Sequence, residues 1–372
     1  LNENINVKGA ASIKFQITLT HHGPVIAGDP SSGLGVTISD PGLIEGSAWP
    51  DAVRNAMRST SVDELHIAFQ NWTDRVNNYV VGDILGNFGY LHEGKIPIRN
   101  ESNGWRAVPG WTGEYDWKGY IPWEELPKAT NPKNGYVVTC NQRVVGHNYR
   151  YFLGLDFAPE FRAKRIQGRI MEREQGSATV SNMAQIHADY ISIPAQILTE
   201  ALDNVVPLDE DSSRALSLLR GWNGEMDRDQ PYPLIYAKTK SNVIRMLLNF
   251  LFDDLSEDIV SGVPGSSALV RQLAMNISIA IEENDPKMLP DDLQWADLLG
   301  LALKDAIFDL KKILGDNIEK WKWGDLHRTQ PKHPLSEYFP DLAEFLDPPS
   351  IPMHGDGDTP LAGSYGLQNE FF

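Results

Sequence analysis

The first 155 residues alternate between apolar and polar side chains in the way that is typical of β-strands. In the segment 12–20 the apolar side chains recur at every second position, which predicts a half-buried strand: Ile13, Phe15, Ile17 and Leu19. A turn follows at 21–24. Further short strands are predicted at 25–26, 34–38, 79–90 and 135–141. Ser61 with Glu64 three residues later forms a capping box, which predicts a helix that runs to about Gln70.

After residue 159 the apolar side chains recur every three or four positions, which predicts helices. The predicted helices cover 160–174, 181–190, 194–204, 210–220, 241–254 and 265–283. One more helix is predicted from a cap at Asp291 or Asp292 to a stop at Gly315. From residue 331 proline and glycine return, and no terminal element is predicted before Phe372.

Strands first and helices afterwards favour an α+β fold over the alternating pattern of a doubly wound sheet. We divide the chain into a strand-rich part (1–155), a helical portion (156–330) and a Pro/Gly-rich return (331–372). Between the strands of the first part lies a long loop with tryptophans at every sixth position: Trp105, Trp111, Trp117 and Trp123. A loop of that length is either packed by its own aromatic side chains, which we favour, or forms a surface on which a ligand stacks.

Charge and composition exclude several classes of protein. The 372 residues carry 33 Lys and Arg against 50 Asp and Glu, a formal net charge of −17, which disfavours nucleic acid and anionic membranes as partners. The longest apolar stretch, 243–252, is far too short to span a bilayer. A single cysteine, Cys140, excludes internal disulfides and multi-cysteine metal sites.

The common catalytic and nucleotide-binding motifs are absent from the sequence, so few residues suggest chemistry by themselves. His21 and His22, at the end of a predicted strand, are more typical of a turn or core contact than of a metal site. The acidic segment 355–359 offers oxygen ligands, yet it lacks the full calcium-loop pattern, and we interpret it as a solvated turn. Cys140 has no assignable base, which disfavours a thiol nucleophile.

One basic segment and one asparagine remain as candidates. Positions 162, 165, 169 and 173 are all arginine and share one helical face, which is typical of an ion-paired helix or of one cation aimed into a pocket. Asn141 follows the predicted strand 135–140, where its carboxamide can donate an N–H to a carbonyl oxygen that develops negative charge.

A series of motifs, in order along nearly the whole chain, resembles the penicillin acylase family of N-terminal-nucleophile hydrolases. The motifs are THHGPVI (20–26), GD and GNFGY (82–90), GKIPIR (94–99), GW to WKGYIP (110–122), NPKNGY leading to Asn141, RAKRI (162–166), Gln185 with Asp189, WNG (222–224), WG with His327, HPL (333–335) and GDGDT (355–359). Each motif is weak singly, and it is their shared order that is specific.

The resemblance implies an amidohydrolase that cleaves the linear amide of an N-acyl substrate, such as a β-lactam side chain or an acyl-homoserine lactone. In that family a precursor cleaves itself, and the larger chain then begins with a serine whose own α-amine acts as the base. The resemblance implies that Asn141 is the side-chain donor of the oxyanion hole and that Arg162 orients the site. Leu1 is not a nucleophile. We therefore expect the serine, the N-terminal part of that larger chain and the whole smaller chain to lie outside this sequence.

The resemblance also implies a four-layer αββα sandwich, present here in part with a large helical portion, and a periplasmic or extracellular location. Some members of the family bind calcium between their two chains. Their upstream carboxylates lie outside this sequence, and His147 and Asn148 stand where another acidic ligand is expected, so we expect no metal or cofactor here.

Two alternatives to an active amidohydrolase stay open. The chain can be a truncated homologue without catalysis that serves as a binding or interaction module. In a third interpretation, the tryptophan-rich loop is a carbohydrate-stacking surface.

Overall fold

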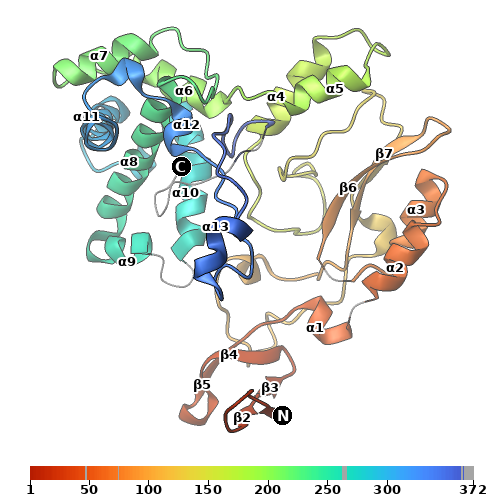
Figure 1. Cartoon of the computed structure of the whole chain (residues 1–372). Coiled ribbons are helices and arrows are strands. Elements are labelled where there is room, and N and C mark those ends of the chain that lie inside the picture. The colour runs from red at the N-terminus through yellow and green to blue at the C-terminus, as the bar shows by residue number, and fades with distance from the viewer. Residues whose placement is uncertain (47, 74, 262–265, 362, 364–372) are drawn as a thin grey trace. The chain divides into compact units, whose positions relative to one another are not determined.

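The computed structural model describes residues 1–372 except 47, 74, 262–265, 362 and 364–372, and it leaves the side chains of 261, 266–269 and 271 undescribed (Figure 1). The chain forms two compact units, which we call unit 1 (residues 1–157) and unit 2 (residues 158–372). Each unit has its own secondary structure and its own apolar clusters.

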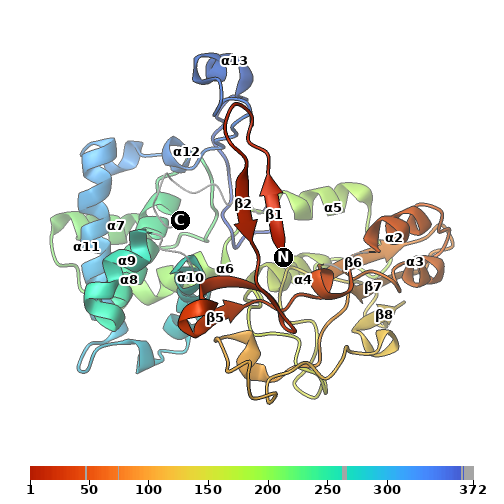
Figure 2. The same cartoon turned by 90° about the horizontal axis from the view of Figure 1, so that it is seen from below.

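The described residues of unit 1 form three small sheets in which every pairing is antiparallel. The first is a ribbon of β1 (Asn2–Ile5) and β2 (Ile13–Gln16), drawn in dark red in Figure 2. The second has the order β3 (Leu19–Thr20), β4 (Gly23–Asp29) and β5 (Leu34–Thr37). The third has the order β6 (Asn77–Gly82), β7 (Phe88–Glu93) and β8 (Lys128–Thr130).

The strand predictions are correct at 25–26, which lies within β4, and at 34–38, and they are wrong in detail at 12–20, 79–90 and 135–141. The predicted strand 12–20 is two strands, β2 and β3, in different sheets. The predicted strand 79–90 is a hairpin, because Asp83 accepts hydrogen bonds from the backbone N–H groups of Leu85 and Asn87, both at 2.9 Å, and folds a turn there. The predicted strand 135–141 is an irregular loop, in which Gly135 (φ 78°) and Asn141 (φ 68°) have left-handed backbones. It pairs with no described strand, so Asn141 does not stand at a strand end.

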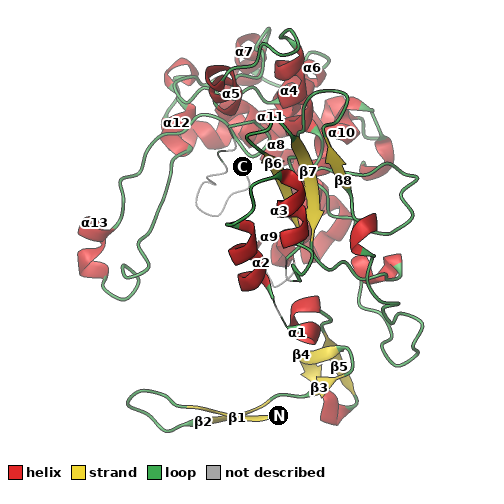
Figure 3. Cartoon of the chain, turned by 90° about the vertical axis from the view of Figure 1, so that its right-hand side faces the viewer, coloured by secondary structure: helices red, strands yellow, loops and turns green. Residues whose placement is uncertain are grey.

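Two short helices, α2 (Trp49–Ala56) and α3 (Val62–Ala68), cover part of the β6–β7–β8 sheet, and Figure 3 shows them beside β7. A third short helix, α1 (Pro41–Glu45), buries none of its residues. Ser61 caps α3 as predicted, since its Oγ accepts from the Glu64 N–H at 3.2 Å. The Glu64 carboxylate, however, accepts from the N–H of Thr60 at 2.7 Å and not from that of Ser61. Among the described residues of unit 1, buried apolar side chains form two small clusters: Ala52, Phe69 and Leu91, and Ile96, Ile121 and Leu126. Val62 and Tyr90 are buried outside them.

Unit 2 is helical and packs around one continuous apolar core. Its helices are α4 (Phe161–Met171), α5 (Val180–His187), α6 (Ile193–Leu202), α7 (Glu210–Leu219), α8 (Tyr232–Phe252), α9 (Ser256–Ser261), α10 (Ser266–Glu282), α11 (Trp295–Leu314), α12 (Trp323–Leu326) and α13 (Ala343–Leu346). The long helices α8 and α11 lie side by side (Figure 1) and bury Leu247, Leu248, Leu299 and Leu303 almost completely. None of the described helices has both the length and the apolarity that a membrane span requires.

The predicted helices match α4, α5, α6, α7 and α10 closely, although the first residue predicted for the last of these, 265, lies outside the described residues. Helix α8 begins nine residues before its predicted start at 241, with Pro233 in its first turn. Helix α11 ends before Gly315 as predicted, but it begins at Trp295. Asp292 has a left-handed backbone (φ 68°), and Gln294 and Asp297 cap the helix in its place. From residue 331 onward, where no terminal element is predicted, the described residues include the short helix α13, and residues 364–372 lie outside the described residues.

Candidate active site

Asn141, the predicted oxyanion-hole donor, lies in an exposed loop of unit 1 with a left-handed backbone (φ 68°). Asparagine adopts this conformation more readily than other residues that carry a side chain. The neighbouring Gln142 holds the turn, because its Oε1 accepts from the Cys140 N–H at 2.6 Å and its Nε2 donates to the Val138 carbonyl at 3.1 Å. Backbone strain of this kind is common at functional sites. The carboxamide is not sealed in an apolar interior.

Arg162, the predicted orienting residue, is the second residue of α4 in unit 2 and is half-buried. Asn141 therefore belongs to one unit and Arg162 to the other. The roles of both residues, and their proximity to each other, remain predictions.

Two of the four arginines on the basic face of α4 form ion pairs, which is one of the two alternatives that its charge pattern predicts. Arg165 donates to both carboxylate oxygens of Asp189, with distances of 2.6–3.1 Å, and Arg169 lies 3.2 Å from the same carboxylate. Arg169 also pairs with Glu172 at 2.6 Å. Asp189 is only 7% exposed and also accepts from the Ile191 N–H at 3.1 Å. This carboxylate therefore connects α4 to the chain that follows α5.

A second buried carboxylate, which sequence reasoning missed, lies in unit 1. Glu93 on β7 accepts from the His66 ring on α3 at 2.6 Å and from the Trp123 indole N–H at 3.0 Å. Lys128 lies 3.2 Å from the other nitrogen of His66. Burial raises the pKa of Glu93 above its usual value, against the opposing effect of His66. No local motif signals this group, because its members are up to 62 residues apart in the sequence.

The opposite face of β7 carries a second network. His92 Nδ1 lies 2.8 Å from Asn78 Oδ1 and 3.0 Å from the Tyr90 hydroxyl. Burial lowers the pKa of His92 to about 4, so the ring is neutral at physiological pH. Burial also raises the pKa of Tyr90. His92, Asn78 and Tyr90 therefore hydrogen-bond to one another within the sheet.

Among the described residues, one group can bring three metal-ligand atoms within 4.8 Å of one another: His21, His22 and Asp116. His22 Nε2 already lies 2.9 Å from the Gly110 carbonyl and 3.5 Å from Asp116, as in a hydrogen-bonded contact between a turn and the tryptophan-rich loop. At the position that the family resemblance points to for calcium, His147 and Asn148 are exposed and supply no carboxylate. We derive no step through calcium.

The tryptophan-rich loop is partly packed and partly exposed. Trp123 stacks on His66 with 4.1 Å between ring centroids, and Trp117 lies edge-on to Tyr120. Trp105 and Trp111 are 65% and 80% exposed. The favoured interpretation, internal packing, therefore describes only half of these four side chains.

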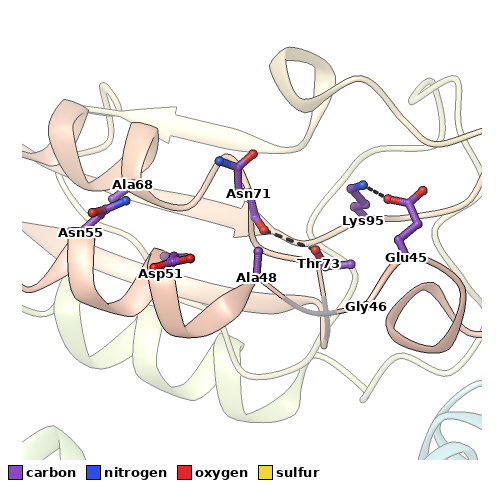
Figure 4. Close-up of a pocket in the computed structure, with 10 residues that line it drawn as sticks. Glu45, Gly46, Ala48, Asp51, Asn55, Ala68, Asn71, Thr73 and Lys95 are labelled. Atoms are coloured by element: carbon purple, nitrogen blue, oxygen red, sulfur yellow. Dashed lines mark hydrogen bonds and ion pairs between the residues drawn. The ribbon is translucent and has the colours of Figure 1, made fainter.

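A polar pocket of about 410 Å³ in unit 1 lies beside α2 (Figure 4). The Lys95 ammonium hydrogen-bonds to the Glu45 carboxylate and thereby lowers the pKa of Glu45. Thr73 donates its hydroxyl hydrogen to the Asn71 carbonyl at 3.3 Å. Neither Asn141 nor Arg162 lines this pocket.

Comparison with known proteins shows which family and which relatives the chain resembles. A family model described as penicillin amidase matches residues 1–372. The chain is 32% identical to the penicillin acylase 2 proenzyme of Pseudomonas sp. strain SE83, over 97% of this chain and 45% of that protein. It is 24% identical to an acyl-homoserine lactone acylase, QuiP, of Pseudomonas fluorescens, over 88% of this chain and 43% of that protein. The chain thus spans less than half the length of these two relatives.

A solved structure shares the fold. The thermostable penicillin G acylase from Alcaligenes faecalis matches with a TM-score of 0.66 at 18% identity, over 100% of this chain and 66% of that chain. This match confirms the predicted α+β class and the N-terminal-nucleophile hydrolase fold. The family model covers the full length along which the motifs of the resemblance are distributed. This chain belongs to the penicillin amidase family.

Proposed function

We propose that the chain is part of an amidohydrolase that cleaves the linear amide bond of an N-acyl substrate. The observation that carries the proposal is the family match over all 372 residues. Relatives named as penicillin acylase and acyl-homoserine lactone acylase point to acylated β-lactams and acyl-homoserine lactones as the first substrates to test.

The nucleophile in this proposal is an N-terminal serine outside these 372 residues. Its own α-amine acts as the base, because an α-amine has a reference pKa of about 7.7–8.0 and is partly unprotonated near neutral pH. The amine takes the hydroxyl proton as the oxygen attacks the amide carbon. It then returns a proton to the leaving nitrogen.

Asn141 stabilises the oxyanion that forms in this attack. Asn141 is exposed and lies on a turn that Gln142 stabilises through two hydrogen bonds. These bonds limit the backbone motion of the turn and so keep the amide donor in position. Arg162, on the first turn of α4, orients the site.

The test measures hydrolysis of penicillin G, an acyl-homoserine lactone and a chromogenic N-acyl anilide by the complete gene product. We expect Asn141→Ala to lower turnover by about 10²–10³-fold with the thermal midpoint retained, since losing one oxyanion donor has that effect. Asn148→Ala, which removes an exposed amide seven residues further on, is the matched control and should leave turnover unchanged.

A second comparison addresses Arg162. Arg162→Ala should lower turnover, and the exposed neighbour Lys164→Ala on the same helix should not. Turnover that survives Asn141→Ala would exclude the oxyanion role. A complete gene product that hydrolyses none of these amides would contradict the proposed function and favour the binding-module alternative.

A further inference from the structure

Unit 2 contains a cavity of about 360 Å³ that none of the predicted site residues lines. Most of its wall is apolar and buried: Met226, Ile244, Val270 and Trp323 are each at most 3% exposed. Lys240, Tyr236, Asp356 and Asp358 also line it. Small-molecule sites in proteins typically have this size and combine apolar walls with a few polar groups.

Asp356 and Asp358 lie on a turn that is stabilised by its own hydrogen bonds. The sequence predicts a solvated turn at 355–359, but Thr359 is fully buried. Its hydroxyl accepts from the Asp356 N–H at 3.0 Å and donates to the Leu361 carbonyl at 2.7 Å. Asp356 Oδ1 accepts from the Asp358 N–H at 2.8 Å, and Trp323 Nε1 donates to the Gly355 carbonyl at 3.1 Å. The turn therefore holds both carboxylates against α8.

The charges of Lys240, Asp356 and Asp358 do not sum to zero. Lys240 pairs with Asp358 at 3.1 Å, with side chains that are 15% and 23% exposed. Burial alone would lower the pKa of Lys240, but Tyr236 and the two carboxylates raise it, so the lysine remains a cation. Burial raises the pKa of Asp356 to about 6, which leaves it ionised at pH 7.5. One ammonium thus faces two carboxylates, a net charge of −1.

An unpaired hydroxyl stands beside these charges. Tyr236 is 2% exposed, and its buried Oη makes no hydrogen bond with normal geometry, although the Ser192 hydroxyl lies nearby. Buried polar groups in folded proteins nearly always have a partner. A group that lines a cavity and lacks one is suited to bind a ligand atom.

We propose that this cavity binds a small organic cation, an aromatic or aliphatic body that carries one protonated amine. The apolar body packs against Met226, Ile244 and Trp323. The ammonium donates hydrogen bonds to the Asp356 carboxylate and to Tyr236 Oη. Bound in this way, the ligand supplies a positive charge beside the two carboxylates and a hydrogen-bond partner for Tyr236 Oη.

The test uses three indoles of similar size and different charge with the full 372-residue chain. They are tryptamine (cation), tryptophol (neutral) and indole-3-propionate (anion), and calorimetric titration at pH 7.5 measures their affinities. We expect tryptamine to bind about tenfold more tightly than tryptophol, because charge-assisted hydrogen bonds are the stronger class. Indole-3-propionate should show no binding.

Three variants locate the site. Tyr236→Phe removes only an unpaired hydroxyl, so the fold should persist while tryptamine affinity falls about threefold and tryptophol affinity does not change. Ala274→Phe on α10 fills the cavity and should abolish binding. Asn276→Phe, on the exposed side of the same helix, is the control and should bind as the wild type does.

Several results would overturn the proposal. They are equal affinities for tryptamine and tryptophol, preference for the anion, no binding of any indole, or tryptamine binding that survives Ala274→Phe. The measurement is of binding and not of turnover, so its failure leaves the proposed amidohydrolase function untouched.

Discussion

His92 and Glu93 are neighbours on β7 and face opposite sides of the sheet, and burial shifts their pKa values in opposite directions. Tyr90 and His92 share one face, whereas Leu91 and Glu93 share the other, as the two-residue period of a strand requires. The pKa of the His92 ring is lowered and that of the Glu93 carboxyl is raised, because burial disfavours the charged form of each. Each group therefore links the stability of unit 1 to pH.

The response of His92 has a definite sign. Its pKa is about 4 in the folded chain against 6.5 when exposed, so the unfolded chain binds a proton more readily. The stabilisation is fully present above pH 6.5 and is lost as pH falls towards 4, by up to about 3 kcal/mol. We expect urea unfolding of His92→Gln to lose less stability than the wild type between pH 7 and pH 4. Exposed His147→Gln is the control, and equal slopes for wild type and His92→Gln would contradict the assignment.

At the scale of the element, two arginines of helix α4 share one carboxylate. Asp189 accepts from Arg165 and lies within ion-pair distance of Arg169, and both arginines are about three-quarters buried. Removing one partner of a buried ion pair leaves the others uncompensated, which costs about 3–5 kcal/mol when the pair is fully buried. The partial exposure of these arginines lowers that cost, because solvent screens the exposed part of the charge.

We therefore expect Asp189→Asn to lower the free energy of unfolding by roughly 2–3 kcal/mol in urea titration. Glu172→Gln breaks another ion pair of the same Arg169, but Glu172 is 52% exposed, so its loss should cost less than about 1 kcal/mol. If both variants lose the same small amount, the Asp189 cluster does not anchor α4.

Helices were predictable where local periodicity and burial agree. The end of α11 before Gly315 and the N-cap of α3 at Ser61 depend on interactions within a few residues, and the structure has both. The predicted strand 135–141 failed because a strand needs a partner, and β-propensity carries no information about whether one is present. The turn at Asp83 was missed although Gly82, Asp83, Gly86 and Asn87 are all residue types that favour turns.

The candidate site was less predictable than the fold. Asn141 and Arg162 came from a family resemblance, since no spacing rule links two residues in different units. The Glu93–His66 pair and the Lys240–Asp358 pair join residues 27 and 118 positions apart, and only the tertiary fold brings them together. Sequence patterns describe local structure well, but they do not reveal such pairs.

At the scale of the whole molecule, the two units differ in how they are stabilised. Unit 2 has a continuous core that includes Leu299, which is fully buried, whereas the buried clusters of unit 1 are small. We expect Leu299→Ala to destabilise unit 2 by about 2–5 kcal/mol, through lost burial and a cavity. Leu301→Ala on the same helix removes a side chain that is 46% exposed and is the control.

Calorimetry checks this division. Because each unit has its own apolar clusters, we expect two unfolding transitions, with Leu299→Ala shifting only the transition of unit 2. A single transition that moves as a whole would mean that the units unfold together.

The proposed mechanism predicts the activity of the 372-residue polypeptide when it is tested alone. Its terminal side chain is that of Leu1, a hydrocarbon, and its terminal amine donates to the Ile17 carbonyl at 2.8 Å. An amine without a hydroxyl beside it can accept a proton but cannot form the acyl-enzyme. We therefore expect no turnover of a chromogenic N-acyl anilide by this polypeptide. Steady hydrolysis that also survives Asn141→Ala would place the nucleophile inside these residues and contradict the proposed mechanism.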